Sequence, residues 1–371
     1  MTGRVTHHTT VPRTTGRVAE PSDIALLRLV GHHLVGPPLA GPVDVVRHLT
    51  AVQAQDEGGA LASVALRCGG TREAVRAAFD AGELARSWPM RGTLHTVVAA
   101  DLPWMLELMT PRPRAASAQR RPQLGLAEDD VVRARGLAEQ ALAGTALTRP
   151  ELLAAWNAAG LTTTGGRGYH LIVELAQRGV LCLGPYRGAV QAFVLLADHV
   201  REPRILEREE ALAELALRFF TGHGPATVAD LARWSFLTMG DVRAGLATVR
   251  DRLAAVEVDG TEYLLAPETL EAYAGLRRAA RKAVLLVPSF DELLLGYQDR
   301  SMTLAPEHAD RVVPGGNGVF RPTLVTGGRA VAVWRTAGTG RNRRLEVDPF
   351  DEAGLEPTVM AAAEERWRAL P

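Results

Sequence analysis

The stretch PATVADLARWSFLTMGDVRAGLATVRDRLAAVEVDGTEYLLAP, residues 225–267, decides the fold. Its first part spaces apolar residues as a helix does and begins at Thr227, a residue type that favours helix starts. A second helical pattern, residues 237–249, follows after a tight turn. Two runs rich in β-formers then flank Asp259-Gly260, a dipeptide typical of two-residue hairpin turns. Helix, turn, helix and hairpin in this order predict a winged helix.

The same order recurs at residues 147–197. Residues 147–160 (LTRPELLAAWNAAG) combine Thr and Pro at the start with Gly at the end, which are the usual limits of a helix. A second helical run follows at 168–179, and residues 180–196 predict a hairpin with its tip near Tyr186-Arg187-Gly188. This segment therefore predicts a second winged helix.

A third, less regular copy lies at residues 21–100. Four helical patterns precede a strand, a turn and a strand in ELARSWPMRGTLHTVVA, residues 83–99, and the turn lies around Pro89–Gly92. The four helices are expected at residues 23–34, 43–49, 58–67 and 72–82.

Beyond residue 283 the pattern changes to an apolar strand, a hairpin around Gly327-Gly328, a basic loop and a closing helix. The predicted fold class is therefore mainly α with β-hairpins (α+β), in which three tandem winged-helix modules surround a small C-terminal β unit. The expected boundaries are a disordered tail at 1–19, winged helices at 20–125, 126–205 and 206–282, and the β unit at 283–371.

Composition sets the class of protein. The chain has 371 residues, of which 47% are apolar, so it is globular and long enough for two or three domains. No uncharged apolar run approaches the roughly 20 residues of a membrane span, and the first 19 residues lack the apolar core of a signal peptide. Two cysteines, Cys68 and Cys182, provide neither a disulfide framework nor an iron–sulfur or structural zinc site. We expect a cytoplasmic monomer without metal or cofactor.

Charge distribution indicates where nucleic acid binds. The net charge is zero, but residues 311–345 hold seven arginines and no acid, and residues 108–127 hold four arginines and no acid. Local basic patches on a neutral protein are compatible with DNA binding and a modest dependence on salt. The alternative is a solvated arginine surface, because Lys282 is the only lysine and arginine supplies the other side-chain cations.

Five motifs resemble the winged-helix DNA glycosylases of the AlkZ/AlkX type, over about residues 21–370 and in the same order. They are HLTAVQAQD (48–56), SWPMRGTLHTV (87–97), DLPWML (101–106), GPATVADLARW (224–234) and VPSFDELLLGYQDR (287–300). Gln55 favours the AlkZ branch, which unhooks interstrand crosslinks of the azinomycin type, over the AlkX branch, which carries Asp there. The resemblance implies double-stranded DNA with alkylated purines or crosslinks as substrate, self-resistance to a DNA-alkylating natural product, and a nucleoid-associated location.

Gln53 and Gln55 are the candidate catalytic residues. If the backbone is extended there, the two glutamines share one face while Ala54 and Asp56 point the other way. Primary amides have no titratable group, so they position a water or support a sugar cation rather than deprotonate water. That suffices for N7-alkylguanine, whose positive charge lets it leave without an acid. The structural alternative is that the pair only caps a helix or holds a turn.

The lysine count bears on mechanism. A glycosylase that also cleaves the strand forms a Schiff base through an amine, and Lys282 lies in a run typical of a helix end. We therefore expect a monofunctional enzyme that leaves an intact abasic site.

Further candidates surround the glutamines. Arg91 and His95, on or near the first wing, are expected to contact DNA, although single residues of these types on strands often have structural roles. Asp56 or Asp291 is a possible carboxylate partner of the glutamine pair, or a cap or salt-bridge residue. Trp88 and Trp104 are expected in the core. A basic hairpin and loop at 317–344 is the candidate DNA clamp, formed by Arg321, Arg329, Arg335, Arg341, Arg343 and Arg344.

Two other functions fit the same elements. A winged-helix transcription regulator would read bases with the second helix of each module, but those helices carry few suitable side chains, mainly Arg243 and His170. A small-molecule-binding or scaffold protein is the third possibility. A crosslinked lesion cannot easily be flipped into a tight pocket, so the glycosylase hypothesis predicts an open, concave C-shape.

Overall fold

The computed structural model describes residues 17–18 and 20–370, so most of the tail expected to be disordered, residues 1–16 and 19, lies outside the described residues. Arg17–Val18 form β1, a strand that pairs in parallel with β7 (Ala254–Val258). The start of the described chain is therefore joined to the third of the predicted modules.

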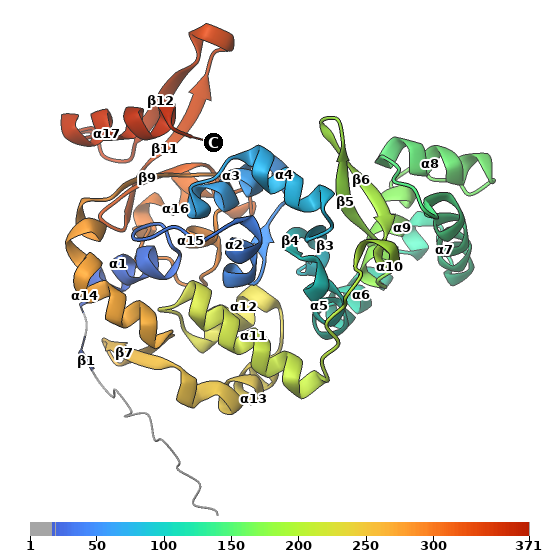
Figure 1. Ribbon diagram of the computed structural model, residues 1–371, viewed down its shortest axis with the longest axis horizontal. Helices are drawn as coiled ribbons and strands as arrows, with labels where there is room; N and C mark the ends of the chain where they lie inside the picture. The colour runs from blue at the N-terminus through green and yellow to red at the C-terminus, as the bar shows by residue number, and fades with distance from the viewer. Residues whose placement is uncertain (1–16, 19, 371) are drawn as a thin grey trace, which may run out of the picture.

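One order of elements occurs three times along the chain (Figure 1). Each time a helix is followed by a short segment that pairs with the last strand of the coming hairpin, then by two helices and the hairpin itself. The first set is α2 (Pro42–Leu49), β2 (Val52–Gln53), α3 (Glu57–Cys68), α4 (Arg72–Asp80), β3 (Leu84–Met90) and β4 (Thr93–Val98). The second is α7 (Glu128–Leu142), the bridge residue Leu147, α8 (Arg149–Ala158), α9 (Arg167–Gln177), β5 (Leu181–Arg187) and β6 (Val190–Leu195). The third is α11 (Arg208–His223), the bridge residue Ala226, α12 (Val228–Ser235), α13 (Met239–Val249), β7 and β8 (Thr261–Leu265).

The local signals in residues 225–267 act as predicted. The hydroxyl of Thr227 accepts a hydrogen bond from Asp230 N at 3.1 Å, and the Asp230 carboxylate accepts one from Thr227 N at 2.8 Å. This reciprocal pair is a capping box that begins α12. Asp259 (φ 49°) and Gly260 (φ 75°) both have positive φ, as a two-residue hairpin turn requires.

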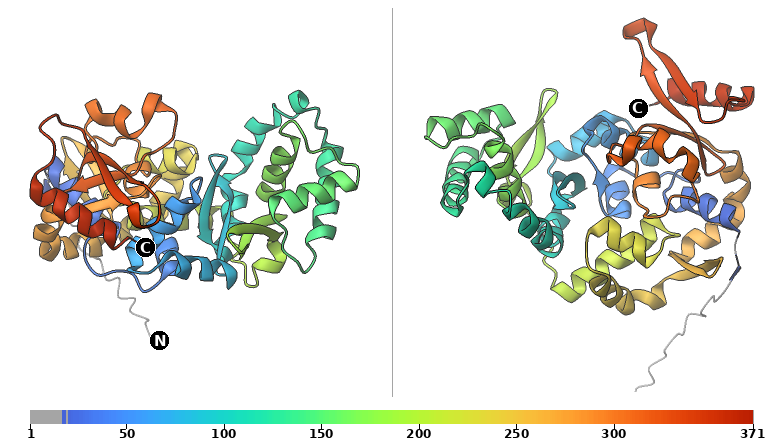
Figure 2. Two further views of the ribbon diagram at one scale, coloured as in Figure 1. Left: turned by 90° about the horizontal axis from the view of Figure 1, so that it is seen from above. Right: turned by 180° about the vertical axis from the view of Figure 1, so that it is seen from behind.

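The hairpins of the first two sets join in one five-stranded sheet, in the order β2-β4-β3-β5-β6. The junction is the antiparallel pairing of β3 with β5, where Arg86 lies opposite Leu183. The second set forms a lobe beside the rest of the molecule (Figures 1 and 2). This sheet was not predicted, because the sequence indicates no pairing partner for the free edge of a hairpin.

The C-terminal segment adds a sheet in the order β12-β11-β10-β9, against whose β9 strand α17 packs. Its long hairpin β11–β12 projects from the body (Figure 1). The elements are β9 (Val284–Val287), β10 (Thr323–Thr326), β11 (Arg329–Ala337), β12 (Arg344–Pro349), α15 (Glu292–Leu295), α16 (Ala309–Val312) and α17 (Pro357–Arg368). The predicted hairpin around Gly327-Gly328 and the closing helix are confirmed. The remaining helices are α1 (Pro21–Gly31), α5 (Leu102–Met109), α6 (Pro111–Ala118), α10 (Leu196–His199) and α14 (Pro267–Lys282).

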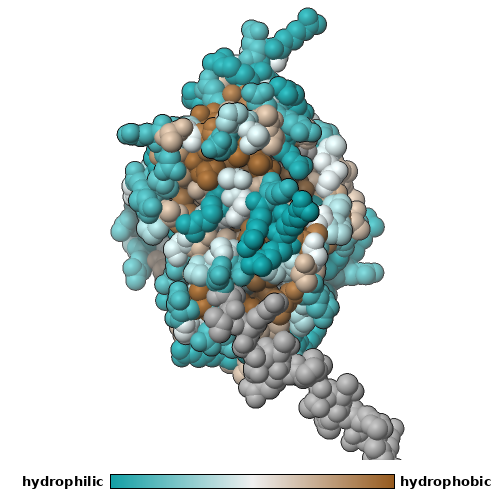
Figure 3. Space-filling model, turned by 90° about the vertical axis from the view of Figure 1, so that its left-hand side faces the viewer, coloured by the Kyte–Doolittle hydropathy of each residue, from teal (hydrophilic) through white to brown (hydrophobic). Residues whose placement is uncertain are grey.

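Burial follows the apolar pattern. Trp88 and Trp104 are buried, as predicted, at 3% and 1% exposure. Polar side chains cover much of the face shown in Figure 3, with apolar patches above and below its middle. Among the described residues, no helix is both long and apolar enough to cross a membrane.

Candidate active site

An unusual turn delivers the glutamine motif. α2 ends at Leu49, and Thr50 adopts φ 67° and ψ −50°, so that Ala51 N donates to the Leu49 carbonyl at 2.7 Å. This is a γ-turn of the rare positive-φ form, which is strained, and more so for a β-branched residue. The turn lets Val52 and Gln53 enter β2 directly and pair with β4.

The two glutamines differ in exposure. The side chain of Gln53 is buried and its Oε1 accepts a hydrogen bond from Gln55 N at 2.7 Å. Gln55 is exposed, and its Oε1 accepts from Leu94 N at 3.4 Å. The expected alternation is wrong here: β2 ends at Gln53, so that Gln53 and Ala54 are buried while Gln55 and Asp56 are exposed. The two amides are nevertheless linked through the Gln53 carbonyl oxygen.

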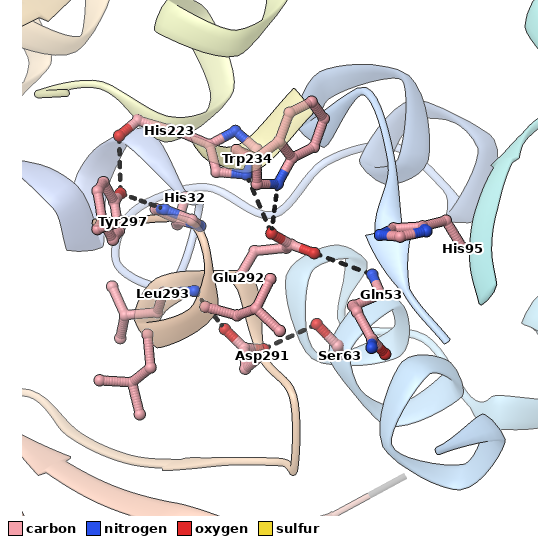
Figure 4. Close-up of polar contacts among 12 residues, drawn as sticks. His32, Gln53, Ser63, His95, His223, Trp234, Asp291, Glu292, Leu293 and Tyr297 are labelled. Atoms are coloured by element: carbon pink, nitrogen blue, oxygen red, sulfur yellow. Dashed lines mark hydrogen bonds and ion pairs between the residues drawn. The ribbon is translucent and has the colours of Figure 1, made fainter. Parts of the chain in front are cut away.

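Behind Gln53 lies the fully buried carboxylate of Glu292, the first residue of α15 (Figure 4). Its Oε1 accepts from Gln53 N at 2.9 Å, and its Oε2 accepts from Trp234 Nε1 at 2.9 Å. His223 Nε2 lies 3.4 Å from the same Oε2. Burial raises the pKa of Glu292, but the hydrogen bond and charge of His223 and the charge of Arg91 outweigh it and lower the pKa to about 2. Glu292 is therefore ionised at neutral pH.

Asp291, the preceding residue, fixes α15 to the first module (Figure 4). Its carboxylate accepts two hydrogen bonds from Arg67, at 2.8 and 2.9 Å, and one from Ser63 Oγ at 2.7 Å. It also accepts from Leu293 N at 3.0 Å and so caps the start of α15. The Arg67 and Asp291 side chains are both completely buried. Asp291 thus has no free carboxylate oxygen for substrate, and its contacts place Glu292.

A second layer of polar groups orders His223. Tyr297 Oη donates to the His223 carbonyl at 2.7 Å and lies 2.7 Å from His32 Nε2 (Figure 4). Because the tyrosine proton is used on the carbonyl, His32 must donate through Nε2, which leaves its Nδ1 to accept from Arg67 Nη2 at 3.4 Å. Burial and the charges of His223 and Arg67 hold the pKa of His32 well below its usual value.

Arg91 and His95 lie at the edge of this site. Arg91 has φ 54° at the β3–β4 turn and donates to the Trp234 carbonyl at 2.5 Å and to His95 Nε2 at 2.9 Å. His95 is fully buried, and its Nδ1 lies 2.9 Å from the Thr93 carbonyl. Burial and the charge of Arg91 lower the pKa of His95 to about 3, so the ring is neutral. The structure therefore gives His95 no surface for DNA and makes it an acceptor that orients Arg91.

Asp56 contacts Ser289, not the side chains of the glutamine pair. Its Oδ2 accepts a short hydrogen bond from Ser289 Oγ. It also lines a cavity of 240 Å³ with Arg72, Trp334 and Leu370. Asp56 and Asp291 both contact the segment 289–295, but neither reaches the glutamine amides through a hydrogen bond in the structure.

The six clamp arginines fall into three groups. Arg321 and Arg329 donate to backbone carbonyls of Arg311, Ser301 and Met302 and so hold loops beneath the hairpin. Arg335 and Arg344 share the carboxylate of Glu346, at 2.6 Å each. Arg343 lies over the Trp367 ring at 5.8 Å, and Arg341 lies in the loop at the tip of the hairpin. The side chains of this last group make neither a hydrogen bond nor an ion pair among the described residues, whereas Arg321 and Arg329 bond to carbonyls and Arg335 and Arg344 to an acid.

Several residues of the site escaped the sequence reasoning. Glu292 lies in the motif at 287–300 but was given no role, and His223, Trp234 and His32 were not singled out. Arg67 carried a signal, because it is the only charged residue within the apolar helical run 58–68 and so requires a buried partner. That partner, Asp291, lies 224 residues away in the chain.

The geometry is thus an amide pair in front of a buried, ionised carboxylate, without an exposed general acid hydrogen-bonded to it. A solved structure, the DNA glycosylase AlkZ of Streptomyces sahachiroi, matches with a TM-score of 0.75 and 28% identity, over 94% of this chain and 95% of that one. A relative described as an interstrand DNA cross-link repair glycosylase, also from Streptomyces sahachiroi, is 30% identical over 333 residues, 85% of this chain and 86% of its own. These likenesses place the protein in the class of DNA glycosylases.

The sequence family described as DNA glycosylase AlkZ-like matches residues 46–369. The chain belongs to this AlkZ-like DNA glycosylase family. Nothing in these matches supports the transcription regulator.

Proposed function

We propose that the protein is a monofunctional DNA glycosylase that hydrolyses the N-glycosidic bond of cationic N7-alkylguanine, including bulky adducts and interstrand crosslinks. The observation that carries this proposal is the pair Gln53 and Gln55, which offers two side-chain amides that no carboxyl group of the described residues hydrogen-bonds. The similarity to a relative described as an interstrand DNA cross-link repair glycosylase supports the crosslink as a substrate.

The chemistry needs no strong base. An N7-alkylated guanine departs as a neutral base, so the enzyme has to hold a water and stabilise an oxocarbenium-like sugar. The Gln53 carbonyl oxygen already accepts from Gln55 N, which fixes the orientation of that amide. Gln55, being exposed, contacts the water or the sugar. Asp56 and Asp291 support the site indirectly, through Ser289 and α15.

Three winged helices and a clamp hold the DNA. We interpret each repeated set of helices and hairpin as one winged helix, arranged as an open C-shape that admits a tethered lesion. Arg91 lies beside the glutamines and meets a phosphate, with His95 as its support. The basic hairpin contacts the DNA phosphates through Arg341 and Arg343, supplemented by Arg335 and Arg344. Arg321 and Arg329 hold the protein loops beneath the hairpin.

The enzyme leaves an abasic site intact. Lys282, the only lysine, is the last residue of α14 and is exposed, and among the described residues no hydrogen bond or ion pair joins it to the glutamine site. Trapping with borohydride should therefore yield no covalent adduct between Lys282 and DNA. A cytoplasmic, nucleoid-associated monomer that protects its producer from an azinomycin-type toxin fits this activity, and survival of toxin-treated cells that express the gene tests that role.

Release of N7-methylguanine from duplex DNA, followed by alkaline cleavage of abasic sites, tests the function. We expect the wild-type protein to release the base. The single-turnover rates of Q53A and Q55A should be lower by at least about tenfold, as when a group positioned for the transition state is removed. Retained rates in both variants would contradict the proposed site. Tight binding to one undamaged sequence without base release would instead support the regulator.

A further inference from the structure

We propose that Glu292 is a positioning residue of the glycosylase, because its ionised carboxylate holds the backbone of Gln53 in the geometry that the reaction uses. The inference rests on the proposed function of the glutamine pair. Glu292 touches no substrate in this account, since its side chain is completely buried.

The first support is the identity of the donor. Glu292 Oε1 accepts from the backbone N–H of Gln53 itself, at 2.9 Å, across 239 residues of sequence. β2 consists of only Val52 and Gln53, so a contact at Gln53 N fixes half of the strand. The next link is the bond from Gln55 N to Gln53 Oε1 at 2.7 Å. A shift of the Gln53 backbone would therefore move both amides.

The second support is backbone strain. The γ-turn at Thr50 places a β-branched residue at φ 67°, only three positions before Gln53. Such conformations are strained and persist only where neighbouring contacts hold them. The β2–β4 pairing is one such contact and lies within the first module. The hydrogen bond from Gln53 N to Glu292 is a second contact, and it reaches β2 from outside that module. The carboxylate thus opposes relaxation of this turn.

The third support is that Glu292 brings the modules together. Its helix belongs to the C-terminal unit, Gln53 belongs to the first module, and Trp234 and His223 belong to the third (Figure 4). Trp234 Nε1 donates to Oε2 at 2.9 Å, and the His223 ring stacks on Phe219 with a centroid separation of 4.6 Å. Gly296 permits this approach, since a Cβ there would lie 2.7 Å from His223 Cδ2. Gln53 thus contacts one oxygen of the carboxylate, and Trp234 and His223 contact the other.

Hydrogen-bond polarity provides a sharp test. The carboxylate accepts on one oxygen from Gln53 N–H and on the other from Trp234 Nε1–H. The amide of an E292Q variant has one acceptor oxygen, so its NH₂ group must face one of these two N–H donors. A buried donor that faces a donor is destabilising, and one of the two orientations places that conflict at Gln53.

A second substitution moves the conflict away from Gln53. In E292Q/W234F the indole N–H is absent, so the amide oxygen can face Gln53 N–H while its NH₂ faces His223. His223 can accept there through Nε2 by taking the tautomer with its proton on Nδ1, which leaves the unpaired buried N–H at His223 and not at Gln53. We therefore expect E292Q to lower the single-turnover rate on N7-methylguanine DNA by about tenfold or more, with the DNA dissociation constant within about twofold of wild type. The double variant should recover most of that rate.

D101N is the matched control. Asp101 is also a buried carboxylate, paired with Arg204 and Arg218, and it contacts none of the site residues. We expect D101N to lose thermal stability but to keep the wild-type rate. A rate for folded E292Q within twofold of wild type would overturn the inference, as would equal rates for E292Q and E292Q/W234F. If the wild-type protein itself released no N7-methylguanine, the proposed function would fail instead, so the two failures are distinguishable.

Discussion

The ionisable side chains of the site are mostly buried. The site combines an ionised acid, Glu292, with two neutral histidines, His32 and His95, within a few contacts of each other. Buried charges are stable only with paired partners, and here the partners come from three parts of the chain. Of the two glutamines, only the uncharged Gln55 is exposed.

The buried histidine His95 predicts a specific pH dependence of stability. Its pKa is about 3 in the folded protein and 6.5 ordinarily, so between these values the unfolded chain binds a proton that the folded chain does not. The contribution of neutral His95 to stability is thus complete above pH 6.5 and is lost as the pH falls toward 3. Each pH unit within this window costs about 1.4 kcal/mol.

The variant H95Q removes this titration. Urea unfolding between pH 6.5 and 4 should show a slope of unfolding free energy that is smaller than wild type by about one proton. An identical slope in the two proteins would mean that His95 is protonated in the folded state.

The sequence allowed the glutamine pair to be identified, but not what lies behind it. Gln53 and Gln55 were accessible because the motif is short, local and matches a family. Glu292 was not, because its role depends on Gln53 and Trp234, which lie far from it in sequence and meet it only after folding. The prediction that Gln53 and Gln55 share one face was wrong, since a two-residue strand does not sustain the alternation of side chains.

Among the helices and strands, local signals predicted most elements well. Asp259-Gly260, the capping box at Thr227 and the turn at Arg91-Gly92 each use chemistry that acts within four residues. The four-residue helix α15 was not predicted, because one turn of helix has no periodicity to read. The five-stranded sheet was missed for a different reason, namely that pairing between hairpins is decided by tertiary packing.

Close helix packing predicts one strong effect. A Cβ at Gly222 in α11 would lie 2.2 Å from the His48 carbonyl oxygen of α2, which is backbone and cannot rotate away. G222A should therefore lower the free energy of unfolding by about 1–3 kcal/mol, the usual range for overpacking.

G275A in α14 is the matched control, because nothing lies within 4 Å of a Cβ there and the residue is exposed. It should raise the free energy of unfolding by about 0.5–1 kcal/mol, from helix propensity alone. Urea denaturation of both variants checks the pair, and equal effects would show that α11 and α2 are not in close contact.

The molecule as a whole is neutral, so its DNA affinity must come from where charge is left unpaired. Glu346 takes up Arg335 and Arg344 on the projecting hairpin, and both arginines would be released without it. If the hairpin is the clamp, E346Q should bind undamaged duplex more tightly and with a steeper dependence on salt.

Removing arginines from the hairpin should have the opposite effect on DNA affinity and on its salt dependence. R341A/R343A should weaken binding to any sequence and reduce the slope of log affinity against log salt by up to about two, because each arginine neutralises about one phosphate. Alanine at Arg278 and Arg281, both exposed on α14, serves as the control. Unchanged slopes in both E346Q and R341A/R343A would remove the hairpin from the DNA interface.

The central claim is that two amides suffice because the leaving base is already a cation. The most direct measurement compares single-turnover release from duplex DNA of N7-methylguanine and of its uncharged isostere, 7-methyl-7-deazaguanine, by the same enzyme. We predict rapid release of the cationic base and none of the neutral one, because the amides of Gln53 and Gln55 have no titratable group and cannot protonate the leaving base. Release of both bases at comparable rates would contradict the account.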